Sequence, residues 1–137
     1  TDKEEDADEL FQQHIEAQCK RLRILGFTGT PIIRGNLNAM DKSLLPSLQT
    51  VCTEILNNIA KHGKPGAFAF ILSVGPDAVR IFASNLYNAA INSAPENHYG
   101  TALIQDFAQQ HNGTMTINSE NEEWSLSLAI PLTHQTH

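Results

Sequence analysis

Four side chains with the chemistry of metal and phosphate binding lie close together near the middle of the chain. They are a carboxylate, an amide, an ammonium and an imidazole: Glu54, Asn58, Lys61 and His62. On a helix, spacings of three and four place Glu54, Asn58 and Lys61 on one stripe, with His62 beside it. Magnesium prefers oxygen ligands and phosphates attract cations. The set therefore suits a metal ion bound to phosphates better than an ordinary solvated face.

A long amphipathic helix is expected to carry these residues. Apolar side chains recur at spacings of three and four just before and among them: Leu44, Leu45, Leu48, Val51, Cys52, Ile55, Leu56 and Ile59. This period predicts a helix with one stripe against a core. A simpler interpretation also fits the same residues. An ordinary helix can end in Lys61 and His62, which favour its negative end, followed by Gly63.

The order E-x-x-x-N-x-x-K-H resembles the N-box of the histidine-kinase-type (GHKL or Bergerat) ATPases, the superfamily that also holds gyrase, Hsp90 and MutL. The Lys-His ending and the helix entry Leu45-Pro46 resemble sensor kinases of the nitrate-sensor type. The resemblance implies that Asn58 binds Mg²⁺ and that Glu54 acts as a base or orients water. It also implies that Lys61 and His62 contact the phosphates of ATP.

A second motif of this family, D-x-G-x-G, is degenerate in this chain. The usual spacing from His62 places Asn85 at the aspartate that binds the adenine amino group, and Tyr87 and Ala89 at the two glycines. The side-chain oxygen of Asn85 can still accept a hydrogen bond from that amino group. Tyr87 adds bulk where the backbone is usually permissive.

The third motif is better preserved. His98-Tyr99-Gly100 resembles the H-Y-G-L segment that opens the last helix of nitrate-sensor-type kinases, with Thr101 where Leu or Met is usual. In the family this glycine lets the helix N-terminus approach the triphosphate, which the helix dipole favours. We therefore include His98, Tyr99, Gly100 and Thr101 among the expected nucleotide-binding residues.

Composition sets limits on the class of protein. The chain has 137 residues with 41% hydrophobic and 18% charged residues, which fits one soluble domain with a core of its own. Six of its 15 acidic residues lie among the first nine positions, so the net charge of −6 reflects that end.

No basic stripe indicates nucleic-acid binding. No apolar run is long enough for a membrane span, and no signal peptide is evident. Cys19 and Cys52 form no disulfide or metal-ligand pattern, so we expect buried thiols.

The order of expected elements indicates an α+β fold. A helix over residues 5–22 precedes a strand pair at 23–29 and 31–37, the long central helix, and a hairpin at 68–74 and 78–84. A long loop at 85–97, a helix at 100–112 and two strands around Met115–Ile117 and Trp124–Ile130 complete the chain. Together with the resemblance, this predicts an α/β sandwich with a mixed, mostly antiparallel sheet and helices layered on one face.

The resemblance implies three regions and one function. Residues 1–22 form a helical lead, the tail of a dimerisation helix; 23–132 form the ATP-binding catalytic domain, with an ATP lid at 86–99; and 133–137 form a tail. The expected function is Mg-ATP binding by a two-component sensor histidine kinase for phosphoryl transfer to a histidine. A non-catalytic module of the same fold, used for binding or dimerisation, is the main alternative. An anti-sigma-type serine kinase is another.

The partners follow from the same resemblance. They are a histidine-containing dimerisation domain of the same full-length protein, a response regulator, and a second copy in a full-length homodimer. The chain would be a cytoplasmic domain of a membrane-anchored sensor. His14 does not match the phosphoacceptor, because Ile15 rather than an acid follows it. We expect His14 to be an exposed helical histidine.

Overall fold

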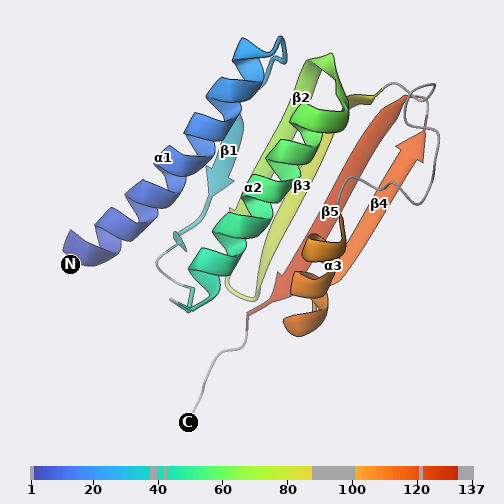
Figure 1. Cartoon of the computed structure of the whole chain (residues 1–137). Coiled ribbons are helices and arrows are strands. Elements are labelled where there is room, and N and C mark those ends of the chain that lie inside the picture. Colours follow the sequence, from blue (N-terminus) through green and yellow to red (C-terminus); the bar gives the residue numbers. More distant parts are fainter. Residues whose placement is uncertain (1, 38–39, 42, 88–100, 121, 133–137) are drawn as a thin grey trace.

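The computed structural model describes residues 2–37, 40–41, 43–87, 101–120 and 122–132. Three helices and five strands follow one another along the chain (Figure 1). The helices are α1 (Asp2–Ile24), α2 (Leu44–His62) and α3 (Thr101–Gln110), and the strands are β1 (Pro31–Arg34), β2 (Gly63–Val74), β3 (Ala78–Tyr87), β4 (Thr114–Glu120) and β5 (Glu123–Pro131).

The strands form one mixed sheet with the order β1-β2-β3-β5-β4. Strand β1 pairs with β2 in parallel, and the three other pairings are antiparallel. The parallel pair is joined by the crossover helix α2, as parallel strands require. The expected mixed, mostly antiparallel sheet is therefore confirmed.

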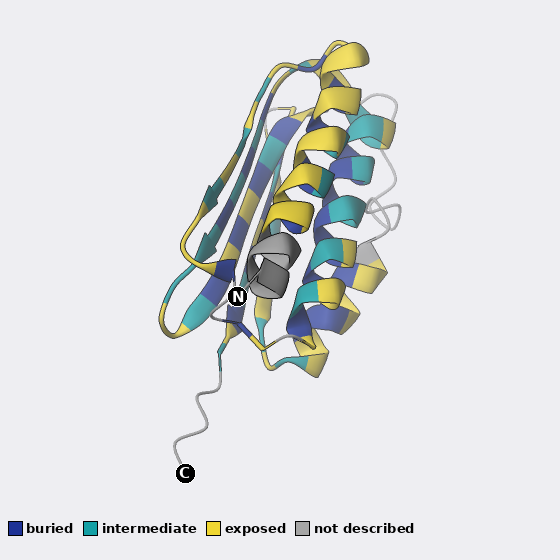
Figure 2. Ribbon diagram, turned by 90° about the vertical axis from the view of Figure 1, so that its left-hand side faces the viewer, coloured by how far each residue is buried: buried dark blue, intermediate teal, exposed yellow. Residues whose placement is uncertain are grey.

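All three helices lie on one face of this sheet, and no described helix covers the other face (Figures 1 and 2). Residues of β5 alternate in burial, with Trp124, Leu126, Leu128 and Ile130 turned to the helices. The apolar stripe of α2 packs on the same inner face, and Leu48, Val51, Cys52 and Ile55 are at most 1% exposed. This is the expected two-layer α+β sandwich.

Helix α1 belongs to the same core. Its four buried apolar side chains, Phe11, Ile15, Cys19 and Leu22, are at most 1% exposed and form one cluster with those of α2 and the sheet. In Figure 1 the helix lies beside α2 and over β1. Within the described residues, no helix combines the length and the apolar character needed to cross a membrane.

The strand pair expected at 23–29 and 31–37 is wrong. The first segment is instead the end of α1, closed by the bonds from Phe27 N to Leu22 O (3.0 Å) and from Gly26 N to Arg23 O (3.1 Å). Gly26 has a φ of +104°, so it supplies the positive φ that such a helix end needs. Beyond it, Thr28 forms only a single bridge to Ala67, and β1 pairs with β2 instead.

Both strands of the hairpin extend further than expected at its open end, away from the turn. Strand β2 begins at Gly63, directly after α2, and β3 continues to Tyr87. Asn85, Leu86 and Tyr87 are therefore strand residues rather than the start of a loop or lid. The rest of the expected loop, residues 88–99, lies outside the described residues.

Candidate functional site

The C-terminal half of α2 carries all four residues of the first motif. Asn58 is buried at 3% exposure, Glu54 and His62 are half-buried, and Lys61 is exposed. Along the stripe, burial is deepest at Asn58. Glu54, one turn before it, is partly accessible, and Lys61, one turn after it, is open to solvent. Lys61 and His62 also lie in the last turn, where the helix dipole favours cations.

The amide of Asn58 is the unusual group in this helix. Its Nδ2 atom is buried and has no hydrogen-bond partner among the described residues. A buried polar atom without a partner costs ~1–3 kcal/mol of folding free energy. Such groups call for an explanation, and a bound molecule that completes the hydrogen bonding is one.

Asn85 lies on the inner face of β3, between Phe68 of β2 and Trp124 of β5 in the strand register. It is 4% exposed, and its Nδ2 donates a hydrogen bond to the backbone oxygen of Leu86 at 2.6 Å. The side-chain oxygen Oδ1 therefore stays available as an acceptor.

Gly63 joins the two motifs in space. A Cβ atom at this position would collide with Nδ2 of Asn85 and lie 2.5 Å from the backbone oxygen of Ile59. The φ of Gly63 is −77°, which any residue can adopt, so space rather than backbone freedom requires glycine here. The C-terminus of α2 and the Asn85 side chain are thus in direct proximity. Nothing in the sequence indicated this contact, because 22 positions separate the two residues.

The two buried amides stand out within the whole described core. Among the described residues, Asn58 and Asn85 are the buried polar side chains, and apolar residues form the rest of the interior. Both were selected from the sequence by motif. Burying a polar side chain costs free energy unless its hydrogen bonds are satisfied, so a buried amide is an informative observation.

The third motif falls mostly outside the described residues, namely His98, Tyr99 and Gly100. Thr101 is the first residue of α3, so the helix begins where the motif predicts, although the side chain of Thr101 is not described. Of the degenerate second motif, Tyr87 ends β3 and Ala89 lies outside the described residues.

The far end of α3 is closed by Asn112 and Gly113. Asn112, with a φ of +58°, is the left-handed residue after the helix, and Gly113 N bonds to Ala108 O at 2.7 Å. A Cβ on Gly113 would collide with Ile130 and lie 2.5 Å from the backbone oxygen of Ala129. Gly113 therefore allows the chain to pass close to β5.

No cluster of three or more His, Cys, Asp or Glu side chains suitable for a metal ion occurs among the described residues. Magnesium does not need such a cluster, because it is commonly held by one or two protein ligands together with phosphate oxygens and water. The half-buried carboxylate of Glu54 and the buried amide of Asn58, one turn apart on α2, are oxygen donors of this kind. These residues fit Mg²⁺ when phosphates supply the remaining ligands.

His14 is not the exposed residue that we expected. It is half-buried between α1 and α2, and its Nε2 lies 2.7 Å from Oγ1 of Thr53. The Thr53 hydroxyl donates its single proton to the backbone oxygen of Gln49 at 2.9 Å. Nε2 of His14 must therefore be the donor. The bond anchors α1 to the residue next to Glu54, which sequence reasoning missed.

The two cysteines are free and buried, as expected. Burial raises the pKa of the Cys19 thiol to about 11, with a further contribution from nearby Glu16. Burial also raises the pKa of Cys52. A raised pKa favours the protonated thiol at neutral pH, which disfavours attack by either cysteine as a nucleophile.

Solved structures with the same fold include the catalytic domain of one histidine kinase and the structures of two others. The catalytic domain of histidine kinase ThkA, in a nucleotide-free form, matches 93% of this chain and 95% of its own, with a TM-score of 0.67 and 12% identity. The Acinetobacter baumannii histidine kinase AdeS matches 95% of this chain at a TM-score of 0.66 and 10% identity. The Erythrobacter litoralis EL346 blue-light activated histidine kinase matches 85% of it at a TM-score of 0.63 and 12% identity.

This chain spans 65% of the AdeS structure and 40% of the EL346 structure. No family model matches the sequence, and no curated protein matches it. At these identities the likeness is one of fold. The chain has the fold of the catalytic, ATP-binding domains of histidine kinases.

Proposed function

We propose that this chain is the ATP-binding catalytic domain of a two-component sensor histidine kinase. One observation carries the proposal: the buried polar side chains of the described core are Asn58 and Asn85, the residues that the N-box and the adenine motif select. Two unrelated amides buried by chance would have no reason to fall on these two positions. The shared fold of the histidine kinase domains supports the same conclusion.

Asn58 would hold Mg²⁺ through its side-chain oxygen, and Glu54, one turn earlier on α2, would act as a base or orient water. When bound, Mg²⁺ would neutralise negative charge on the triphosphate during transfer of the γ-phosphoryl group. The buried Nδ2 of Asn58 would gain an acceptor from the nucleotide or its water. Lys61 and His62, at the end of the stripe, would contact the phosphates through their side-chain nitrogens.

Asn85 would bind the adenine amino group through Oδ1. Its Nδ2 already donates to the oxygen of Leu86, and this bond holds the amide in the orientation that presents its oxygen. The N-terminus of α3, with Thr101 and the preceding His98, Tyr99 and Gly100, would approach the triphosphate.

The γ-phosphoryl group would pass to a histidine on a dimerisation domain of the same full-length protein, and from there to a response regulator. His14 is poorly suited to accept the phosphoryl group, because its Nε2 is already hydrogen-bonded to Thr53. The full-length protein would act as a homodimer, with this domain in the cytoplasm and the sensor anchored in a membrane.

A non-catalytic module of the same fold is the second candidate. It is favoured by the second motif, where Asn85 replaces the expected aspartate and Tyr87 and Ala89 replace the glycines. Such a module would bind a partner or dimerise without phosphoryl transfer. Nucleotide binding separates the two functions.

The test is calorimetric titration of the chain with a non-hydrolysable ATP analogue, with and without Mg²⁺. We expect magnesium-dependent binding that Asn58→Ala abolishes. Asn57→Ala is the matched control, since Asn57 is a half-buried amide one position earlier on α2, and this variant should bind like the unmodified chain. No binding at millimolar analogue would contradict the kinase proposal and favour the non-catalytic module.

A further inference from the structure

The uncovered face of the sheet, here the outer face, carries an apolar row across three strands. Ile32 of β1 lies beside Ile71 of β2, which lies beside Phe82 of β3 in the strand register. Ile32 is 42% exposed and Phe82 is 40% exposed. The next row along the same strands holds small side chains, namely Ala69, Ser84 and Ser125. Large and small side chains therefore form two adjacent rows.

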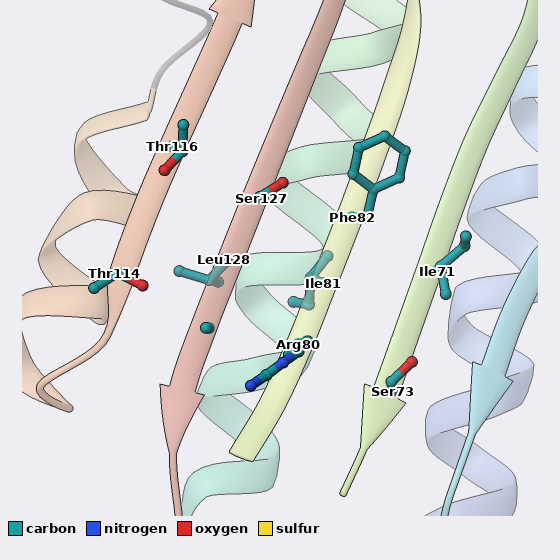
Figure 3. A pocket seen from close by; sticks show the side chains of 10 residues that line it. Ile71, Ser73, Arg80, Ile81, Phe82, Thr114, Thr116, Ser127 and Leu128 are labelled. Atoms are coloured by element: carbon teal, nitrogen blue, oxygen red, sulfur yellow. The ribbon is translucent and has the colours of Figure 1, made fainter.

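One end of the outer face is hollowed. A cavity of about 330 Å³ lies between Arg80 and Phe82 of β3 and the two threonines of β4, Thr114 and Thr116. Its floor is formed by small side chains of β5, including Ser127. Figure 3 views this face with the helices behind the sheet, and Arg80 extends from β3 toward β5 over the hollow.

The opposite end of the same face is acidic. Glu120 of β4 lies directly opposite Glu123 of β5, and Glu122 occupies the turn between them with a φ of +63°. Like charges directly opposite each other on a sheet destabilise it. Neither Glu120 nor Glu123 forms an ion pair with any described residue, and the same holds for Arg80. The outer-face charges of the two end rows are thus opposite in sign, with Arg34 and Arg80 in one row and Glu120 and Glu123 in the other.

The outer face is complementary to the outer face of a second copy whose strands run in the opposite direction. The relating two-fold axis would run across the strands, midway between the row of Phe82 and the row of Ser84. This operation keeps each strand over its counterpart and reverses the order of the rows. Phe82 then lies over the partner's Ser84, and Ile71 lies over the partner's Ala69. Arg80, leaning toward β5, meets the partner's Glu123.

We infer that the outer face is a homodimer interface, in which the acidic hairpin end of one copy enters the Arg80 hollow of the other. The contact is isologous, so every pairing occurs twice. It relieves the Glu120–Glu123 repulsion and places Phe82 and Ile71 each on a small side chain of the partner. It uses none of the described residues proposed to bind nucleotide, which lie on the helices or on the inner face of the sheet.

The size of the face sets the expected affinity. Four rows of five strands cover about 24 Å by about 25 Å, so a face-to-face dimer buries on the order of 1,200 Å² in total. That area is at the low end for specific interfaces. We expect a dissociation constant on the order of 10–100 µM.

Sedimentation equilibrium of the chain is the test, with charge reversals at Arg80 and Glu123. Arg80→Glu and Glu123→Arg should each weaken dimerisation at least about tenfold. The double variant should restore it, because the reversed charges again attract across the interface. Within one copy the two residues are three rows apart, roughly 20 Å, so no internal ion pair can explain the rescue.

Arg34→Glu is the matched control. Arg34 lies in the same row as Arg80, but on β1, where the axis brings no partner acid; this variant should dimerise nearly normally. A monomeric mass up to about 1 mM, roughly ten times the weakest expected dissociation constant, would overturn the inference. A dimer indifferent to both single reversals would overturn it as well, since dimerisation would then use another surface.

Discussion

The two faces of the sheet place polar and apolar groups in opposite ways. The inner face buries two amides, Asn58 from α2 and Asn85 from β3, within an otherwise apolar core. The outer face exposes the apolar row that includes Ile32 and Phe82, together with charges that form no ion pair with a described residue. Each departure from the ordinary distribution carries a cost, so each points to a contact outside this chain. The inner departure suits a small polar ligand, and the outer one suits a protein surface.

The largest expected effect is a difference in unfolding free energy between a substitution on the inner face and one on the outer face. Phe70 of β2 is 0% exposed and Phe82 of β3 is 40% exposed. Phe70→Ala should lower the free energy of unfolding by ~3–5 kcal/mol, because it leaves a cavity in the core. Phe82→Ala should lower it by less than ~1 kcal/mol at concentrations where the chain is monomeric. Urea unfolding measures both values, and equal losses would mean that the outer face is also part of the core.

Gly63→Ala should have the next largest effect. Its added Cβ meets the backbone oxygen of Ile59 and the amide of Asn85, so we expect a loss of ~2–3 kcal/mol in the free energy of unfolding. Asn85→Ala should remove part of that loss, since one of the two collisions disappears. A double-mutant cycle by urea unfolding measures this coupling. Strict additivity would refute the proposed proximity of the two motifs.

Asn58→Leu should separate function from stability. Because Nδ2 of Asn58 is buried without a partner, an apolar residue of similar size should raise the free energy of unfolding by ~1 kcal/mol. The same change should abolish magnesium-dependent binding of the ATP analogue. Thermal unfolding and calorimetry test the two halves. A destabilised variant would indicate that the amide is satisfied within the folded chain.

The smallest expected effect concerns the contact between α1 and α2. Thr53→Val removes the acceptor for His14 and should cost ~1 kcal/mol of the free energy of unfolding. Thr50→Val is the control, because Thr50 makes the same bond to its own helix at 3.1 Å but is exposed. It should cost no more than a few tenths of a kcal/mol. Equal effects in urea unfolding would show that the His14 bond adds nothing.

The sequence by itself determined the elements with a strong period and the motif that they carry. The three- and four-residue spacing of α2 gave its buried stripe and set Glu54, Asn58, Lys61 and His62 on one helix. The alternation from Trp124 to Ile130 predicted β5 with its buried face. These signals are local, because each arises from the repeat of a single helix or strand.

The tertiary structure alone decided which distant residues meet. Only the packing of α2 on β3 placed Asn85 beside Gly63, and only the strand register brought Ile32, Ile71 and Phe82 into one row. Sequence patterns also predicted a strand where α1 ends. In the structure Gly26 closes the helix there, through hydrogen bonds to residues of its last turn. The contacts between distant residues, in contrast, depend on how complete elements pack, and no spacing along the chain encodes them.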